Sequence, residues 1–167
     1  AGPFDAMAAT STRIIDQVGK AASDDDVKAI VLAVNSPGGG VVASDQIYHS
    51  LVTQTKPLVV SMGELAASGG YYVSVPADWI IATPNTLTGS IGVISEFINI
   101  QGLMQEYGVE AVTIASGPRK DFGSPFRSMT NKEREYWQDL TNDTHSAFVD
   151  IVAKGRDLST ETVLQLA

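Results

Sequence analysis

The sequence predicts an α/β protein with a mainly parallel sheet, βαβ units and flanking helices. Short apolar runs rich in β-branched residues, such as 27–35 and 57–62, are typical of strands buried on both faces. Stretches with apolar residues at helical spacing separate these runs, and a helix between two strands of one sheet makes a right-handed crossover between parallel strands. The 167 residues hold no internal repeat and no linker long enough to separate two domains, so we expect a single domain over residues 1–167.

The first half of the chain predicts two helices and two strands. Apolar residues at helical spacing predict a helix over 6–22, which the acidic run SDDD ends. The run VKAIVLAVN (27–35) predicts the first strand, and PLVVSM (57–62) predicts the second. Between them, the turn SPGGG (36–40) leads into an amphipathic helix over 41–54.

The second half continues the alternation. The expected elements are, in order, a helix within 68–75, strands at 79–83 and 90–94, a helix at 99–107, a strand at 110–116 and a long helix over about 131–154. Thr130 and Glu133 give this last helix the Ser/Thr-x-x-Glu capping signature at its start.

Composition excludes several classes of protein. Hydrophobic residues make up 44% of the chain and charged residues 18%, which is typical of a globular protein. The formal net charge of −8 argues against nucleic acid as a partner, because phosphate binding needs clustered lysine and arginine. The absence of cysteine excludes disulfides, thiolate metal sites and a cysteine nucleophile. No apolar run of about 18 residues is present, so the chain as given contains no membrane-spanning segment.

The first candidate site is the glycine turn NSPGGG at 35–40. Consecutive glycines can turn the backbone so that N–H groups face a ligand oxygen, as an oxyanion hole requires. An ordinary turn that opens a helix would use the same residues. A phosphate loop is excluded because no Gly-Lys-Ser/Thr follows.

The second candidate is Ser68 in AASGG. A serine at a strand-to-helix turn, flanked by alanine and glycine, can expose its hydroxyl and lie beside backbone N–H groups. Small residues also occur where a helix packs closely on a sheet, and the residues alone leave both interpretations open. A serine nucleophile in addition needs a base.

The third candidate is the lysine that would act as this base. His49 and His145 lie within expected helices and not at strand ends, which favours surface or packing roles. Lys120 follows the expected buried strand, and burial can lower a lysine pKa from about 10.4 by roughly 3–5 units. Arg119 cannot replace it because guanidinium stays protonated. The alternative for Lys120 is an exposed loop cation paired with Asp121.

Four motifs occur in a fixed order: NSPGGG, AASGGYYVSVPAD, TPNTLTGSIGVI and SGPRKDFGSPFRSMT. Together they closely resemble the signal peptide peptidase A family, which comprises serine proteases of peptidase family S49 in the ClpP/crotonase superfamily. The resemblance covers nearly the whole chain, from about residue 13 onward. It implies a ClpP/crotonase-like fold.

The resemblance also implies site residues. Carried over by position, Ser68 is the nucleophile, Lys120 is the general base, and the Gly39 and Gly69 amides form the oxyanion hole. Ser90 matches a hydroxyl that orients the lysine. The family needs no metal or organic cofactor, and its substrates are remnant signal peptides and other extended hydrophobic peptides, cleaved through an acyl-enzyme.

The resemblance further implies assembly and location. Short family members form ring-shaped homo-oligomers in which the serine and the lysine meet across a subunit boundary. Family members sit at the cell membrane through an N-terminal anchor, with the catalytic domain outside the cytoplasm. We therefore expect this chain to be a soluble catalytic core that lacks the anchor and a short C-terminal segment.

Three other functions are compatible with parts of the pattern. A ClpP-like Ser/His/Asp protease is disfavoured because the stretch where its histidine would lie reads SIGVISEF, residues 90–97. A crotonase that binds a coenzyme A thioester would not explain the joint presence of the AASGG serine and the lysine loop. A catalytically silent scaffold or membrane-associated binding protein on the same fold stays open.

Overall fold

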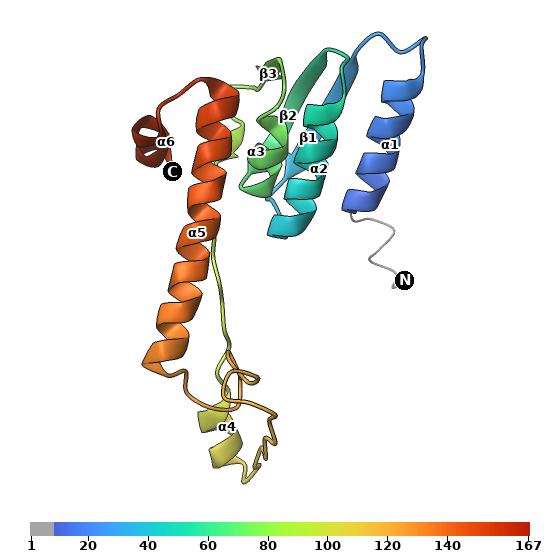
Figure 1. The fold of residues 1–167 in the computed structure, drawn as a ribbon. Coiled ribbons are helices and arrows are strands. Elements are labelled where there is room, and N and C mark those ends of the chain that lie inside the picture. The colour runs from blue at the N-terminus through green and yellow to red at the C-terminus, as the bar shows by residue number, and fades with distance from the viewer. Residues whose placement is uncertain (1–8) are drawn as a thin grey trace. The chain divides into compact units, whose positions relative to one another are not determined.

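A computed structural model describes residues 9–167 of the chain (Figure 1), so residues 6–8 of the expected first helix lie outside the described residues. The chain divides into two compact units, which are described separately. Unit 1 comprises Ala1–Gly92, from which the first eight residues are not described, together with Ala147–Ala167; unit 2 comprises Val93–Ser146. The single domain expected from the sequence stays a prediction.

A four-stranded parallel sheet forms the centre of unit 1. Its strands are β1 (Ile30–Ser36), β2 (Leu58–Ala67), β3 (Trp79–Ile81) and β4 (Leu87–Gly89). β1 pairs with one edge of β2; β3 and β4 pair with the other edge, β3 near the start of β2 and β4 near its end. All three pairings are parallel, which confirms the predicted parallel sheet. As a result, the carboxyl ends of β1, β2 and β4 lie together at one edge of the sheet.

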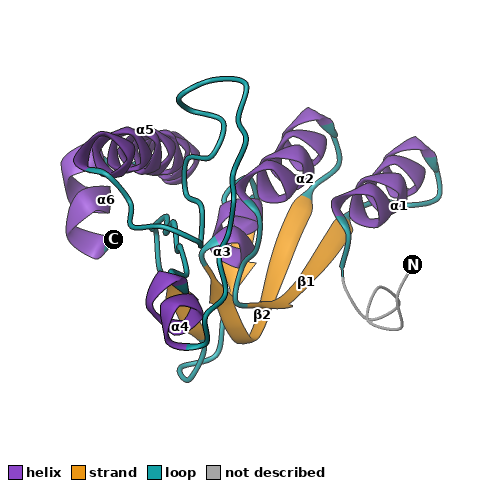
Figure 2. Ribbon diagram, turned by 90° about the horizontal axis from the view of Figure 1, so that it is seen from below, coloured by secondary structure: helices purple, strands orange, loops and turns teal. Residues whose placement is uncertain are grey.

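Helices cover one face of this sheet. Figure 2 shows α1 (Ser11–Ser23) and α2 (Val41–Thr53) side by side over β1 and β2. The short helix α3 (Gly69–Ser74) follows directly on β2. The helices expected within 6–22, 41–54 and 68–75 are thus confirmed over the described residues. The core beneath them contains Val18, Ile30, Val34, Leu51, Leu58, Val60, Met62, Ala66 and Ala77.

The opposite face of the sheet is exposed. Buried and exposed side chains alternate along β1 and β2; Ile30 and Val34 are buried, whereas Val31 is 67% exposed. The expectation that these strands are buried on both faces is therefore wrong. Both strands carry apolar residues on both faces, but α1, α2 and α3 cover only one.

A second core cluster lies within unit 1 and includes residues from the last part of the chain. The helix α5 (Asn131–Arg156) begins in unit 2 and ends in unit 1, and α6 (Thr160–Leu166) follows it. The buried members of the cluster are Tyr72, Val75, Ile91, Phe148, Val149, Val152 and Val163. The predicted long helix is confirmed. Among the described residues, no helix is both long and apolar enough to span a bilayer.

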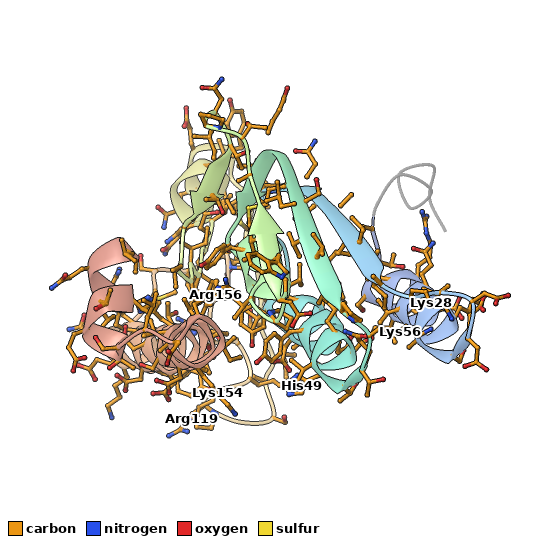
Figure 3. All side chains as sticks on the ribbon, turned by 90° about the horizontal axis from the view of Figure 1, so that it is seen from above. Lys28, His49, Lys56, Arg119, Lys154 and Arg156 are labelled. Atoms are coloured by element: carbon orange, nitrogen blue, oxygen red, sulfur yellow. The ribbon has the colours of Figure 1, made fainter. Side chains whose placement is uncertain are left out.

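Lys56 and Arg156, both labelled in Figure 3, bind backbone carbonyls at or just beyond the ends of helices in unit 1. Lys56 Nζ donates to the Ala21 carbonyl at 2.7 Å and to the Asp24 carbonyl, at the end of α1. Arg156 donates to the Ala77 carbonyl at 2.9 Å, just beyond α3. Carbonyls at helix ends lack intrahelical partners, so both side chains satisfy groups that would otherwise need water.

Unit 2 contains α4 (Gln101–Glu106) and the first part of α5, joined by loops. All of residues 93–146 are described, and none lies in a strand, so the strand expected at 110–116 is wrong. The stretch contains three consecutive β-branched residues, 112–114, but Val112 is 77% exposed and Ile114 is 95% exposed. A strand needs a neighbouring backbone to satisfy its N–H and C=O groups, and local preference does not supply one.

Candidate active site

The glycine turn and Ser68 leave the sheet side by side. Ser36 at the end of β1 lies opposite Ala66 near the end of β2, so the chain segments that follow both strands start from one edge. Gly38 has a φ of +110°, and a Cβ on this residue would lie 2.7 Å from the Gly69 nitrogen and 2.9 Å from the Ser68 Cβ. The glycine turn therefore needs both the left-handed φ and the missing side chain. The two candidate sites thus lie at one edge of the sheet.

Ser68 has a strained backbone at the junction of β2 and α3. Its φ is 52° and its ψ is −121°, a conformation that L residues rarely adopt. Such strain costs about 1–3 kcal/mol and persists only where the surroundings fix the backbone. Here the Ser68 N–H donates to the Gly89 carbonyl at 2.9 Å, and the Ser68 carbonyl accepts from the Tyr72 N–H at 2.9 Å. A strained serine at a strand-to-helix turn is the geometry that presents a nucleophilic hydroxyl.

The small residues after Ser68 also serve close packing. A Cβ on Gly69 would collide with the Ser44 hydroxyl of α2, and a Cβ on Gly70 would lie 2.9 Å from the Ser36 carbonyl oxygen. Helix α3 can thus approach α2 and the end of β1 only because both residues are glycine. Close packing, one of the two interpretations of AASGG, is correct, and it leaves the hydroxyl of the half-buried Ser68 free for a second role.

Two backbone amides beside Ser68 have no partner within the described chain. Neither the Gly39 N–H nor the Gly69 N–H donates a hydrogen bond to any described residue. The two segments are adjacent, because a Cβ on Gly69 would lie 3.1 Å from the Gly39 nitrogen. Unpaired amides next to a serine hydroxyl are able to stabilise an oxyanion.

Ser90 lies next to Ser68 along the sheet edge. Ala67 and Gly89 are paired in the parallel ladder, so Ser68 and Ser90 are the residues that follow this pair. Both have positive φ, which is 49° at Ser90. The strand expected at 90–94 is therefore wrong: pairing occurs at 87–89 and stops where Gly89 and Ser90 take positive φ. Apolar residues continue past this point, but β2 has already turned into α3.

Lys120 belongs to unit 2 and lies in the loop between α4 and α5. Its N–H donates to the Gly117 carbonyl at 3.2 Å, and its side chain is exposed, with no hydrogen bond or ion pair to any described residue. Ser68 belongs to unit 1, so the structure does not define its separation from Lys120. Ser68, Gly39, Gly69 and Ser90 are brought together; Lys120 is not placed relative to them.

The alternative pairing of Lys120 with Asp121 is absent. The Asp121 carboxylate instead accepts from Arg127 Nε at 2.8 Å. Arg127 also forms a two-bond fork with Glu133, from Nη1 to Oε2 at 2.8 Å and from Nη2 to Oε1 at 2.6 Å. The arginine therefore joins two carboxylates, one of them next to Lys120 in the chain.

This cluster has shifted pKa values with clear causes. Hydrogen bonds from Arg127 and then from the Thr130 N–H hold the pKa of Glu133 well below its usual range. The bond from Arg127 also lowers the pKa of Asp121, and the two carboxylates raise that of Arg127. Sequence reasoning found Glu133 only as a capping residue, and that prediction is confirmed by the Thr130–Glu133 bonds. It missed Arg127. The one indication of Arg127 in the sequence is its place in the motif SGPRKDFGSPFRSMT, which also contains Lys120.

The two histidines lie on helices, as expected. His49 on α2 is bonded through Nδ1 to the Asp45 carbonyl at 2.9 Å, and its side chain is 64% exposed. His145 lies within α5 in unit 2. Among the described residues, no group of three or more histidine, aspartate or glutamate side chains is arranged to hold a metal ion.

The sheet, its helices and the strained serine beside a glycine turn define an α/β protein with the fold of the Clp proteases. A solved structure of a ClpP1 mutant from Listeria monocytogenes matches 93% of this chain and 70% of its own, with a TM-score of 0.59 and 17% identity. The family model for Clp protease matches residues 5–88. The likeness extends to the fold alone.

The model of peptidase family S49 matches residues 50–167, and the chain belongs to this family. A Methanocaldococcus jannaschii protein named as a protease is 45% identical over 146 residues, which cover 86% of this chain and 47% of that protein. An Enterococcus faecium protein named as a signal peptide peptidase is 40% identical over 156 residues, covering 92% of this chain and 45% of its own. The chain thus spans just under half the length of these relatives.

Proposed function

We propose that the chain is the catalytic core of a serine endopeptidase that uses a dyad of Ser68 and Lys120. The observation that carries the proposal is the strained Ser68 with the unpaired Gly39 and Gly69 amides beside it. Membership of peptidase family S49 supports the same activity. The role of Lys120 rests on the resemblance of its loop to the family motif.

The reaction follows from these roles. Neutral Lys120 Nζ takes the proton from Ser68 Oγ as the oxygen attacks a peptide carbonyl, and the Gly39 and Gly69 amides stabilise the resulting oxyanion. The lysine ammonium then gives its proton to the leaving amine, and the acyl group stays on Ser68. Water attacks this ester with the lysine again acting as base, which releases the acid product and restores the serine. Ser90 would orient the lysine.

A lysine base also implies an assembly. A lysine in water has a pKa of about 10.4, so a base that works near neutral pH must be desolvated. Lys120 is exposed within the single chain. We therefore propose a ring-shaped homo-oligomer in which a neighbouring subunit covers this loop and completes the dyad.

The proposed substrates are remnant signal peptides and other extended hydrophobic peptides. The name of the Enterococcus faecium relative supports this class. An extended peptide can add as a strand at the sheet edge beside the glycine turn, where backbone bonds bind it and apolar surfaces receive alternate side chains. Such substrates fit a protease at the cell membrane whose catalytic domain lies outside the cytoplasm.

Labelling with a fluorophosphonate probe tests the dyad. We expect the wild type to be labelled, Ser68→Ala to be unlabelled and Lys120→Ala to be labelled far more slowly. Matched controls are Ser61→Ala and Lys132→Ala, which change exposed residues of β2 and α5 and should label like the wild type. Undiminished labelling of Lys120→Ala would refute the lysine base.

Size measurement by light scattering accompanies each labelling reaction. An assembled wild type that remains unlabelled would favour the silent scaffold instead of the peptidase. A labelled wild type that is strictly monomeric would contradict the dyad across subunits while leaving the serine nucleophile in place.

A further inference from the structure

One arginine, Arg127, links the part of the loop next to Lys120 to α5. Within residues 117–130 the local backbone bonds are short-range turns, such as Lys120 to Gly117 at 3.2 Å and Ser124 to Asp121 at 3.0 Å. These turns shape the loop but do not attach it to a helix. Other contacts join the loop to the helices: the Ser128 N–H and hydroxyl donate to Gln101 Oε1 of α4, and the Phe122 ring packs against Tyr136 of α5. Arg127 attaches the segment next to Lys120 to α5, whereas Arg119 extends outward from the loop (Figure 3).

Every N–H of the Arg127 guanidinium has an acceptor. Nε donates to Asp121 Oδ2; Nη1 donates to Glu133 Oε2 and, at 3.1 Å, to the Ser128 carbonyl. Nη2 donates to Glu133 Oε1 and, at 3.2 Å, to the Asp121 carbonyl. A guanidinium has five such protons in a rigid plane, so these bonds fix its position and orientation.

Glu133 fixes this cluster on α5. Its side chain is 1% exposed, and Oε2 also accepts from the Thr130 N–H at 2.8 Å and the Thr130 hydroxyl at 2.7 Å. Both residues belong to the capping box that starts α5, a helix of 26 residues. The connection therefore runs from α5 through Glu133 and Arg127 to Asp121, the residue next to Lys120.

We propose that Arg127 is a positioning residue with two roles. It ties the Lys120 loop to α5, and it holds the Asp121 carboxylate in a hydrogen bond to its own guanidinium, away from Lys120. The inference rests on the proposed role of Lys120 as general base. The basic nitrogen must lie within about 2.6–3.2 Å of the oxygen whose proton it takes, and misplacement by about 1 Å can cost roughly 100-fold in rate. A fixed loop keeps Lys120 at the position that this distance demands.

The second effect of Arg127 is electrostatic, because it holds the Asp121 carboxylate away from Lys120. An opposite charge within about 4–6 Å favours the protonated form of a lysine and raises its pKa by roughly 1–3 units. Asp121 is adjacent to Lys120 in the chain, and its carboxylate would be available for such a pair if Arg127 did not hold it. Glu133, the other carboxylate of the cluster, is occupied by Arg127 and Thr130. Arg119, which precedes Lys120 in the chain, faces outward (Figure 3).

The pH dependence of kcat/KM separates these effects from a purely structural role. In Arg127→Gln we expect kcat to fall by about 100-fold and the acid limb of the profile to move up by about one pH unit, because Asp121 is released to pair with Lys120. The double variant Arg127→Gln with Asp121→Asn should return the acid limb to its wild-type position while kcat stays low. Arg134→Gln, which changes an exposed arginine one turn into α5, is the matched control and should leave both unchanged.

Asp121→Ala provides a second variant that keeps the Arg127–Glu133 fork and therefore the start of α5. It should lower kcat and leave the acid limb in place. Wild-type kcat and an unmoved acid limb in a folded Arg127→Gln would overturn the inference, as would a moved limb that Asp121→Asn does not restore. Full activity of Lys120→Ala would instead overturn the base itself, and with it this inference, so the two failures are distinguishable.

Discussion

The Ser68 N–H donates a hydrogen bond of 2.9 Å to the carbonyl oxygen of Gly89. This bond extends the parallel ladder of β2 and β4 by one step beyond the Ala67–Gly89 pair. It holds the Ser68 backbone at the point where the chain must turn into α3. The strain at Ser68 is thus maintained by a neighbouring strand and not by the AASGG segment alone.

Replacing Ser68 separates strain from chemistry. Both Ser68→Gly and Ser68→Ala remove the hydroxyl, but only glycine adopts a φ of 52° and a ψ of −121° without a steric penalty. We expect Ser68→Gly to be more stable than Ser68→Ala by about 1 kcal/mol, since the strain of about 1–3 kcal/mol is partly offset by the greater freedom of glycine in the unfolded chain. Urea denaturation measures this difference.

The same pair of changes at Ser50 is the control. Ser50 lies within α2, where alanine is favoured over glycine by about 1 kcal/mol. The order of stability should therefore reverse between the two sites. An order at Ser68 that matched the order at Ser50 would contradict the strain.

Gly38→Ala should disrupt the glycine turn. The new methyl group would lie 2.7 Å from the Gly69 nitrogen, and alanine is strained at a φ of +110°. We expect a loss of at least ~1–3 kcal/mol in the free energy of unfolding, measured by urea denaturation, together with loss of probe labelling. Gly19→Ala in α1 meets nothing within 4 Å and should stabilise the protein by about 0.5–1 kcal/mol.

Much of unit 1 follows from local sequence. The runs at 27–35 and 57–62 contain enough β-branched residues to specify strands, and SPGGG can only be a turn, so β1 and α2 lie close to their predicted positions. β2 begins close to its predicted start but continues beyond the predicted end at 62, to Ala67. The parallel arrangement then places Ser68 beside the glycine turn. What local sequence could not predict is the register that ends β4 at Gly89, because this depends on where β2 turns away.

The lysine loop was less predictable. Lys120 was singled out as the residue after a strand, yet residues 110–116 form no strand, so that reason was wrong. The Arg127 network depends on five hydrogen bonds among side chains and loop carbonyls, and no periodicity encodes such contacts. The capping signature of Thr130 and Glu133 was visible because both partners lie within one helical turn.

Tyr72 should contribute to stability through its hydroxyl. The hydroxyl donates to Asp45 Oδ1 at 2.8 Å, and burial, followed by the bond to Asp45, raises the pKa of Tyr72 above its usual value. We expect Tyr72→Phe to lose about 1 kcal/mol in the free energy of unfolding near neutral pH. Because the folded pKa is raised, this contribution is complete below pH ~10 and is lost as the pH rises further.

Urea denaturation at pH 7 and above pH 10 checks this prediction. The wild type and Tyr72→Phe should converge in stability at the higher pH. Tyr107→Phe is the control, since Tyr107 is 72% exposed and should give no difference at either pH. A gap between the wild type and Tyr72→Phe that widened with pH would contradict the raised pKa.

Glu133 should make stability depend on acid pH. Its folded pKa lies below its unfolded value, so its contribution is present above pH ~4.3 and is lost as the pH falls toward the folded pKa. Thermal unfolding followed by circular dichroism from pH 7 to pH 2 should show the wild type well above Glu133→Gln at neutral pH, with the gap narrowing below pH ~4.3. Glu135→Gln, which changes an exposed carboxylate on the same helix, should follow the wild-type curve throughout. A constant gap between the wild type and Glu133→Gln would mean that the arginine does not lower the pKa of this carboxylate, and that packing alone explains the effect of the substitution.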